Sequence, residues 1–111
     1  MQAGKLRHRI TIQRRPLTKD SAGQRTGPWE DVFIDLPAEV RDLAGRELVS
    51  AQEIHAEVTG AIFLRGFEGW RSQIKPDMRV VSGERIFDVR SVTNPDGRNR
   101  ELQLLTMEIV G

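Results

Sequence analysis

The side chains that could exchange protons or bind a metal ion are few in this chain of 111 residues. It has two histidines, His8 and His55, and neither a cysteine nor a tyrosine. The segment His55-Ala-Glu57 has the His-x-Glu form of a zinc deaminase, but it lacks the cysteines that hold zinc in such a site. We therefore interpret both histidines as packed or boundary residues rather than as ligands or catalysts.

Carboxylate pairs offer a second route to chemistry, through general acid and base catalysis. Glu30 with Asp31, and Glu53 with Glu57, have suitable spacings, but the same spacings describe a solvated face, which we favour. The glycines form no phosphate-binding loop of the Gly-x-Gly-x-x-Gly or Gly-x-x-x-x-Gly-Lys-Ser/Thr type. We predict no catalytic residue, no cofactor and no metal site. A hydrolase that uses its carboxylates is kept as a third hypothesis, which would require dependence on a metal or a substrate.

Aromatic and guanidinium groups gather near residue 70, where Phe67 and Trp70 are flanked by Arg65 and Arg71. Such planes can stack on the bases of a single nucleic-acid strand. The two aromatic rings can equally cover the open end of a small barrel. Both interpretations stay open on the sequence alone.

The first fifteen residues are basic, although the formal net charge of the whole chain is only +1. They carry Lys5, Arg7, Arg9, Arg14 and Arg15 and no acidic residue. This segment is a solvated strand face, a patch that faces DNA phosphates, or a docking surface for an acidic protein. Contact with DNA would lose affinity steeply with salt because bound counterions are released. A protein interface would depend on salt less steeply and on shape as well as charge.

The elements that position these residues follow from hydrophobic periodicity. In residues 4–13, Leu6, His8, Ile10 and Ile12 alternate with the basic side chains, which predicts a basic strand buried on one side. Residues 14–28 contain two prolines, two glycines and almost nothing to bury, which predicts a long, mobile loop.

The rest of the chain predicts one helix among short strands. Residues 29–43 alternate as a strand, in which Pro37 indicates either a sheet edge or a bulge. Apolar residues and His55 recur at steps of three and four, which predicts an amphipathic helix over about residues 46–57: Leu48, Ala51, Ile54, His55 and Val58. Strands follow at 58–66, 79–81, 85–92 and 100–109, with turns at Ser82-Gly83 and at 94–97.

These elements predict a mainly β fold, a small antiparallel β-barrel or curled sheet of five to six strands with one inserted α-helix. The length fits a single domain over residues 1–111. We expect Trp29, Phe33, Phe63 and Phe87 in its core. With no cysteine the core holds by packing alone, which suits a reducing cytosol. No apolar run approaches the roughly 20 residues of a membrane span, and no signal peptide is apparent, so we expect a soluble, unexported protein.

Residues spread over most of the chain form a further pattern by their order and spacing: Gly4, Leu6, Arg7, Arg9, Ile10, Gly23, Trp29, Ala38, Val40, Glu47, Ala51, Ile62, Arg65, Met78-Arg79-Val80, Phe87-Asp88-Val89, Asn94, Arg100-Glu101-Leu102 and Leu104. In this pattern the chain resembles the phage head-tail joining family, also described as head-tail adaptor, head completion or stopper proteins. It departs from the family at two packing positions. Pro37-Ala38 stands where relatives often have Trp-Ala, and Leu105 where a cysteine is common.

The resemblance implies a structural virion protein without enzymatic activity. Its β-barrel with an inserted helix would join a ring of twelve copies in the head-tail connector, beneath the portal, through which the DNA passes. The ring would seal the DNA-filled capsid and provide the attachment surface for the tail. Implied partners are a portal-proximal adaptor ring and the tail or a tail-completion protein, and assembly would occur in the cytoplasm of the host bacterium. Adaptor and tail-terminator positions in the same joint, and a nucleic-acid-binding barrel that uses the basic first strand, remain alternatives.

Two sets of site residues follow as hypotheses. Lys5, Arg7 and Arg9 dock on the neighbouring ring. A loop orders on assembly and comprises Thr18, Lys19, Asp20, Ser21, Ala22, Gly23, Gln24, Arg25, Thr26 and Gly27. We expect the isolated subunit to be a monomer, because the partner ring templates assembly.

Overall fold

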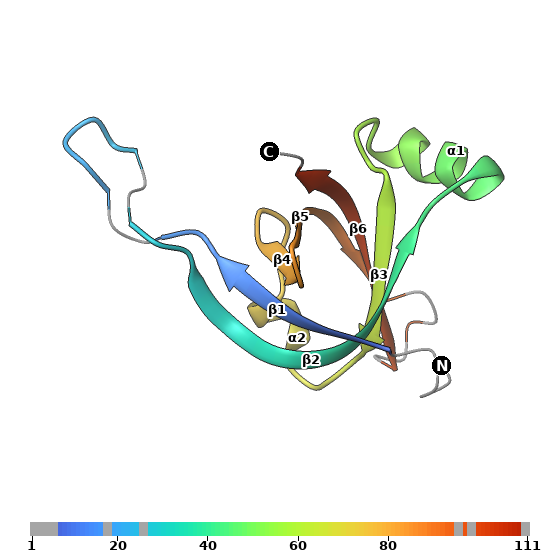
Figure 1. Cartoon of the computed structure of the whole chain (residues 1–111), viewed down its shortest axis with the longest axis horizontal. Helices are drawn as coiled ribbons and strands as arrows, with labels where there is room; N and C mark the ends of the chain where they lie inside the picture. The colour runs from blue at the N-terminus through green and yellow to red at the C-terminus, as the bar shows by residue number, and fades with distance from the viewer. Residues whose placement is uncertain (1–6, 17–18, 25–26, 95–96, 98–99, 110–111) are drawn as a thin grey trace.

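The computed structural model describes residues 7–16, 19–24, 27–94, 97 and 100–109. In chain order the elements are β1 (His8–Arg14), β2 (Glu30–Asp42), α1 (Gly45–Ile54), β3 (Gly60–Arg65), α2 (Trp70–Gln73), β4 (Arg79–Ser82), β5 (Arg85–Thr93) and β6 (Glu101–Ile109) (Figure 1). Neither helix in these ranges is long and apolar enough to cross a membrane.

The strands close into an antiparallel barrel in the order β1-β2-β3-β6-β5-β4, with β4 paired back to β1. This confirms the predicted fold class and settles it as a closed barrel of six strands. Two details of the prediction were wrong. The first helix ends at Ile54 rather than near residue 57, and a second short helix, α2, was not foreseen. The loop between β1 and β2 spans residues 15–29, one position later than predicted, because Arg14 still pairs with Glu30.

The pairing of β2 with β1 has two register shifts, and the first of them is a β-bulge. Ile10 faces Leu36 and Ile12 faces Phe33, so two residues of β2 oppose one of β1. The extra residue lies at Ile34 and Asp35, where Asp35 has a left-handed backbone with φ of 61°. The pairing of β2 with β3 begins at Ala38, so Pro37 stands just outside that ladder, and the bulge lies just before it.

The main core fills the barrel interior, with Phe87, Leu64 and Ile62 among its fully buried side chains. Trp70 of α2 and Ile74 just after it belong to this core. The αL conformation of Gly69, with φ of 83°, lets the chain turn into α2 and bring Trp70 inward. Phe87 lies in this core, as predicted, and Phe33 is partly buried and packs against the same cluster.

A second, smaller cluster lies outside the barrel wall, where α1 crosses β3 and β6. It consists of Ala51, Val58, Ala61 and Leu105, with Phe63 and Leu43 packed against it. Helix α1 buries only Ala51, and Ile54, expected in its apolar stripe, is 64% exposed. The helical period was right, but the wall offers α1 too little surface to cover a full stripe.

Candidate functional site

A basic row lies on the outer surface of the barrel near the start of β1. Because Ile10 and Leu64 point into the core, their neighbours Arg9 and Arg65 point outward. Arg9 stands opposite Pro37 on β2, and Arg65 stands opposite Glu101 on β6. Both arginines are exposed, and within the part of the chain that the structure describes neither forms an ion pair.

The predicted docking residues fall at this place. Arg9 is in the row, and Arg7 is exposed immediately before β1. Lys5 lies outside the described residues. The structure thus places Arg7 and Arg9 at one end of the first strand, beside strands β2 and β3.

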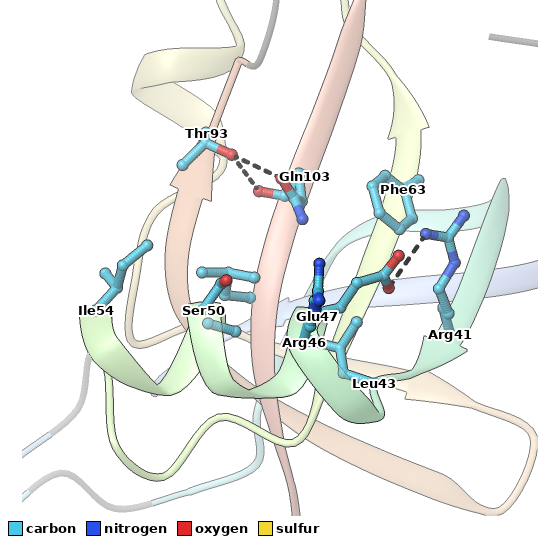
Figure 2. Close-up of a pocket in the computed structure, with 11 residues that line it drawn as sticks. Arg41, Leu43, Arg46, Glu47, Ser50, Ile54, Phe63, Thr93 and Gln103 are labelled. Atoms are coloured by element: carbon cyan, nitrogen blue, oxygen red, sulfur yellow. Dashed lines mark hydrogen bonds and ion pairs between the residues drawn. The ribbon is translucent and has the colours of Figure 1, made fainter.

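A hollow of the surface lies near this row and was not predicted. It is a groove of about 450 Å³ between α1 and the outer faces of β3, β5 and β6 (Figure 2). Apolar side chains line much of it, and Ser50 of α1 points toward its middle. We call it the α1 groove and define it by its lining residues: Arg41, Leu43, Arg46, Glu47, Ser50, Ala51, Ile54, Phe63, Thr93, Gln103 and Leu105.

Arginine and carboxylate groups shape one end of the α1 groove. The guanidinium of Arg41 lies 4.6 Å from the ring centroid of Phe63 and pairs with Glu39 at 2.8 Å and Glu47 at 3.8 Å. Arg46 lies near the start of α1, is exposed and forms no ion pair among the described residues. Arg41 is already paired with these two glutamates, so Arg46 is the lining cation that could meet an acidic partner.

The loop hypothesis concerns a segment that projects away from the barrel (Figure 1). Thr18, Arg25 and Thr26 lie outside the described residues. Between them, the carboxylate of Asp20 accepts hydrogen bonds from the backbone N–H groups of Ala22 and Gln24, both at 2.9 Å. Gly23 has a left-handed φ of 83°, and its N–H donates to the carbonyl of Asp20. The tip is therefore a locally closed turn, and its ordering on assembly stays a prediction.

Trp29, expected in the core, instead stands at the base of this loop between two arginines. The guanidinium of Arg79 lies 4.3 Å from its ring centroid and that of Arg15 lies 5.2 Å away. Arg79 also donates to Gln13 at 2.7 Å, and Gln13 donates to Asp31 at 2.7 Å. This cation–π contact ties the loop to β1 and β4, and Trp29 belongs to neither hydrophobic cluster.

The residues considered for catalysis are not brought together. His8 is exposed and accepts a hydrogen bond from the backbone N–H of Val40 at 3.4 Å, and His55 caps the end of α1. Glu57 pairs with Arg90 at 3.5 Å. The described residues contain no group of three or more side chains suited to hold a metal ion.

One of the two aromatic side chains considered for base stacking is buried in the structure. Trp70 is 6% exposed and belongs to the core, so its ring is not available on the surface. Phe67 packs edge-on against Phe33 with centroids 5.3 Å apart. Of the two interpretations left open by the sequence, the structure favours aromatic rings that cover the barrel end.

An ion-pair network lies where the ends of three strands meet. Arg85 of β5 donates to both carboxylate oxygens of Glu108 on β6, at 2.9 and 2.8 Å, and to Asp42 on β2 at 2.8 Å. Hydrogen bonding from Arg85 lowers the pKa of Glu108, and the two carboxylates raise the pKa of Arg85. The network bridges neighbouring and non-neighbouring strands, and nothing in it suggests proton transfer.

Comparison with known proteins adds information that the geometry alone does not contain. A family model described as "Phage head completion protein" matches residues 1–109. Head completion protein gp7 of Enterobacteria phage HK97 is 29% identical over 101 residues, which cover 89% of this chain and 86% of that protein.

Two solved structures share the fold. Protein SF1141 from Shigella flexneri 2a has a TM-score of 0.70 at 28% identity, over 97% of this chain and 96% of that one. A chain of the virion of a native gene transfer agent particle has a TM-score of 0.61 at 22% identity, over 93% of this chain and 96% of that one. At that identity the second likeness concerns the fold alone.

Proposed function

This chain belongs to the phage head completion protein family, a family of structural head proteins rather than enzymes, and from that premise we propose that it forms a ring in the head-tail connector. The ring seals the DNA-filled capsid and provides the attachment surface for the tail. The family match over residues 1–109, together with the relative in phage HK97, is the observation that carries the proposal. The ring holds twelve copies and the genome passes through it.

The barrel suits a ring subunit for a physical reason. A subunit of a closed ring needs two different surfaces that fit each other, because head-to-tail contacts close by rotation. The closed barrel supplies a rigid body, while the α1 groove, the basic row and the projecting loop supply distinct surfaces on it. Assembly takes place in the host cytoplasm on a portal-proximal adaptor ring.

Within this function Arg7, Arg9 and Lys5 dock on the neighbouring ring, and the loop from Thr18 to Gly27 orders on assembly. Support comes from the exposure of Arg7 and Arg9 and from the absence of ion pairs at Arg9 among the described residues. An acidic surface on the neighbouring ring would attract these arginines, and few other polar groups would lose their hydration in the contact.

Deletion of the gene in its phage or prophage tests the function. After induction, electron microscopy of negatively stained particles should show separate tails and tailless heads, leaking or empty, and a plasmid copy of the gene should restore tailed particles. Normal tailed virions without the gene would refute the joining role.

The docking residues are tested in the same complementation. Changing both Arg7 and Arg9 to alanine should lower the yield of tailed particles about tenfold, the effect of about 1.4 kcal/mol of lost contact. The matched control changes Arg71 and Lys75, two exposed cations elsewhere on the barrel, to alanine and removes the same charge. Equal yields from both pairs would show that the basic row has no special part in docking.

A further inference from the structure

One exposed isoleucine, Ile34, projects from the surface, whereas the α1 groove is a hollow in it. Ile34 is 68% exposed, the highest value among the large hydrophobic residues that the structure describes. The bulge in β2 turns it outward, since the extra residue breaks the alternation that would otherwise point it inward. Asp35 follows it directly and is exposed. The bulge therefore presents an apolar side chain beside a carboxylate.

The charge and shape of Ile34 and Asp35 complement the α1 groove, which offers apolar lining side chains and an arginine without an ion pair. Arg46 has no ion pair, and neither has Asp35, within the described part of the chain. A cavity of about 150 Å³ already holds a benzene-sized group, so a groove of about 450 Å³ has room for an isoleucine and part of its strand. Apolar insertion ringed by opposite charges is a common design of specific protein contacts.

The two surfaces cannot satisfy each other within one subunit. Ile34 lies in the half of β2 that pairs with β1, whereas Leu43 of the α1 groove follows the other end of the same strand. Arg41, the nearest lining residue on β2, is seven residues from Ile34, which is at most about 23 Å at 3.3 Å per residue. A contact between two different surfaces of neighbouring copies is heterologous, and such a contact generates a ring when its rotation closes.

We propose that Ile34, with Asp35 beside it, inserts into the α1 groove of a second copy of this chain, where Asp35 meets Arg46. This inference rests on the proposed ring and names the contact between its subunits. The occupant is this chain itself, because the same molecule carries both the acidic apolar knob and the basic apolar groove.

Cysteine cross-linking tests the contact without background, because the chain has no cysteine of its own. The deletion phage is complemented with the chain carrying Ile34→Cys and Ser50→Cys, and purified particles are oxidised and run on a non-reducing gel. We expect a ladder at multiples of 12.6 kDa, reversed by reduction. The matched control carries Ile109→Cys with Ser50→Cys, since Ile109 is also an exposed isoleucine of a strand, and should give no ladder.

Each outcome of this experiment decides. Particles that contain the double-cysteine chain but give no ladder, an equal ladder from the control, or a cross-link to another virion protein would overturn the inference and leave the proposed function standing. Absence of the wild-type chain from particles would refute the proposed function, and the inference with it.

A charge exchange keeps the test valid if the cysteines impair folding. Asp35→Lys and Arg46→Glu should each lower incorporation of the chain into particles about tenfold, the usual scale for one opposed charge in an interface. The double variant should recover to within about threefold of wild type. A double variant no better than the poorer single variant would overturn the contact.

Discussion

The bulge in β2 makes a prediction about stability that is independent of any partner. Asp35 has φ of 61°, its side chain is exposed, and it forms no ion pair among the described residues. We compare two replacements, Asp35→Gly and Asp35→Val, because glycine and valine respond to left-handed backbone in opposite ways.

The expected magnitudes follow from this φ value. In an ordinary strand, valine is more stable than glycine by about 1 kcal/mol. Left-handed backbone costs an L-residue about 1–2 kcal/mol and is worst for β-branched side chains. Glycine avoids that strain but loses about as much through the entropy of the unfolded chain. Asp35→Gly should therefore stay within about 0.5 kcal/mol of wild type, and Asp35→Val should lose about 2 kcal/mol.

Urea denaturation followed by circular dichroism measures both variants, with Arg9 as the control position. Arg9 is an exposed strand residue that is not among the residues with positive φ, so the valine variant should be more stable than the glycine variant there. With a slope of about 1–3 kcal/mol per molar urea, 2 kcal/mol shifts the midpoint by about 1 M. If valine matches or exceeds glycine at position 35, Asp35 is not left-handed and Ile34 is not turned outward by this bulge, which removes the knob from the proposed ring contact.

Three further changes test other parts of the structure. In a double-mutant cycle, Trp29→Leu and Arg79→Gln should show a coupling of about 0.5–1 kcal/mol in urea unfolding, as expected for a partly exposed cation–π pair, and additive effects would contradict the contact at 4.3 Å. Thr106→Val should raise stability by about 1 kcal/mol, because the buried hydroxyl of Thr106 finds no partner among the described residues, whereas a loss would indicate a hidden hydrogen bond. The lowered pKa of Glu108 means that its bond to Arg85 stabilises the fold above the usual glutamate range and is lost as the pH falls through the lowered value. Glu108→Gln should therefore be less stable than wild type at neutral pH, and the difference should shrink as the pH falls below the usual glutamate range in pH-dependent urea unfolding, whereas a constant difference would refute the linkage.

The closed barrel could be predicted because its local signals agree with its tertiary structure. Ile10 and Ile12, and Leu102 and Leu104, alternate in the sequence and all point into the core. The hairpin between β4 and β5 turns at Gly83, whose φ of 60° needs glycine, as the Ser82-Gly83 signal indicated. Local and tertiary preferences coincide in these strands, so sequence reasoning succeeds.

The exposure of Arg7 and Arg9 could be predicted, but the bulge, the α1 groove and the place of Trp29 could not, because each of these depends on what a segment meets in the fold. Val32, Ile34 and Leu36 alternate without a break in the sequence, yet the bulge exposes Ile34 and lets Phe33 pack on the core. Trp29 resembled a core residue because the arginines that stack on it lie at distant positions in the chain. The only available signal was the conflict at Pro37, which indicated a bulge or an edge and did not place it.

Helix α1 forms one wall of the α1 groove and buries little surface against the barrel. Its local stability is therefore separate from that of the barrel. Of its residues only Ala51 is buried, whereas the strands are joined around a closed ring of backbone hydrogen bonds. Segments with so little buried surface open locally at a fraction of the free energy of global unfolding. Amide hydrogens of α1 in the free subunit therefore exchange with solvent well before those of β3 and β6. Occupation of the α1 groove closes this local opening, so hydrogen exchange in one helix reports docking while the exchange of the barrel stays unchanged.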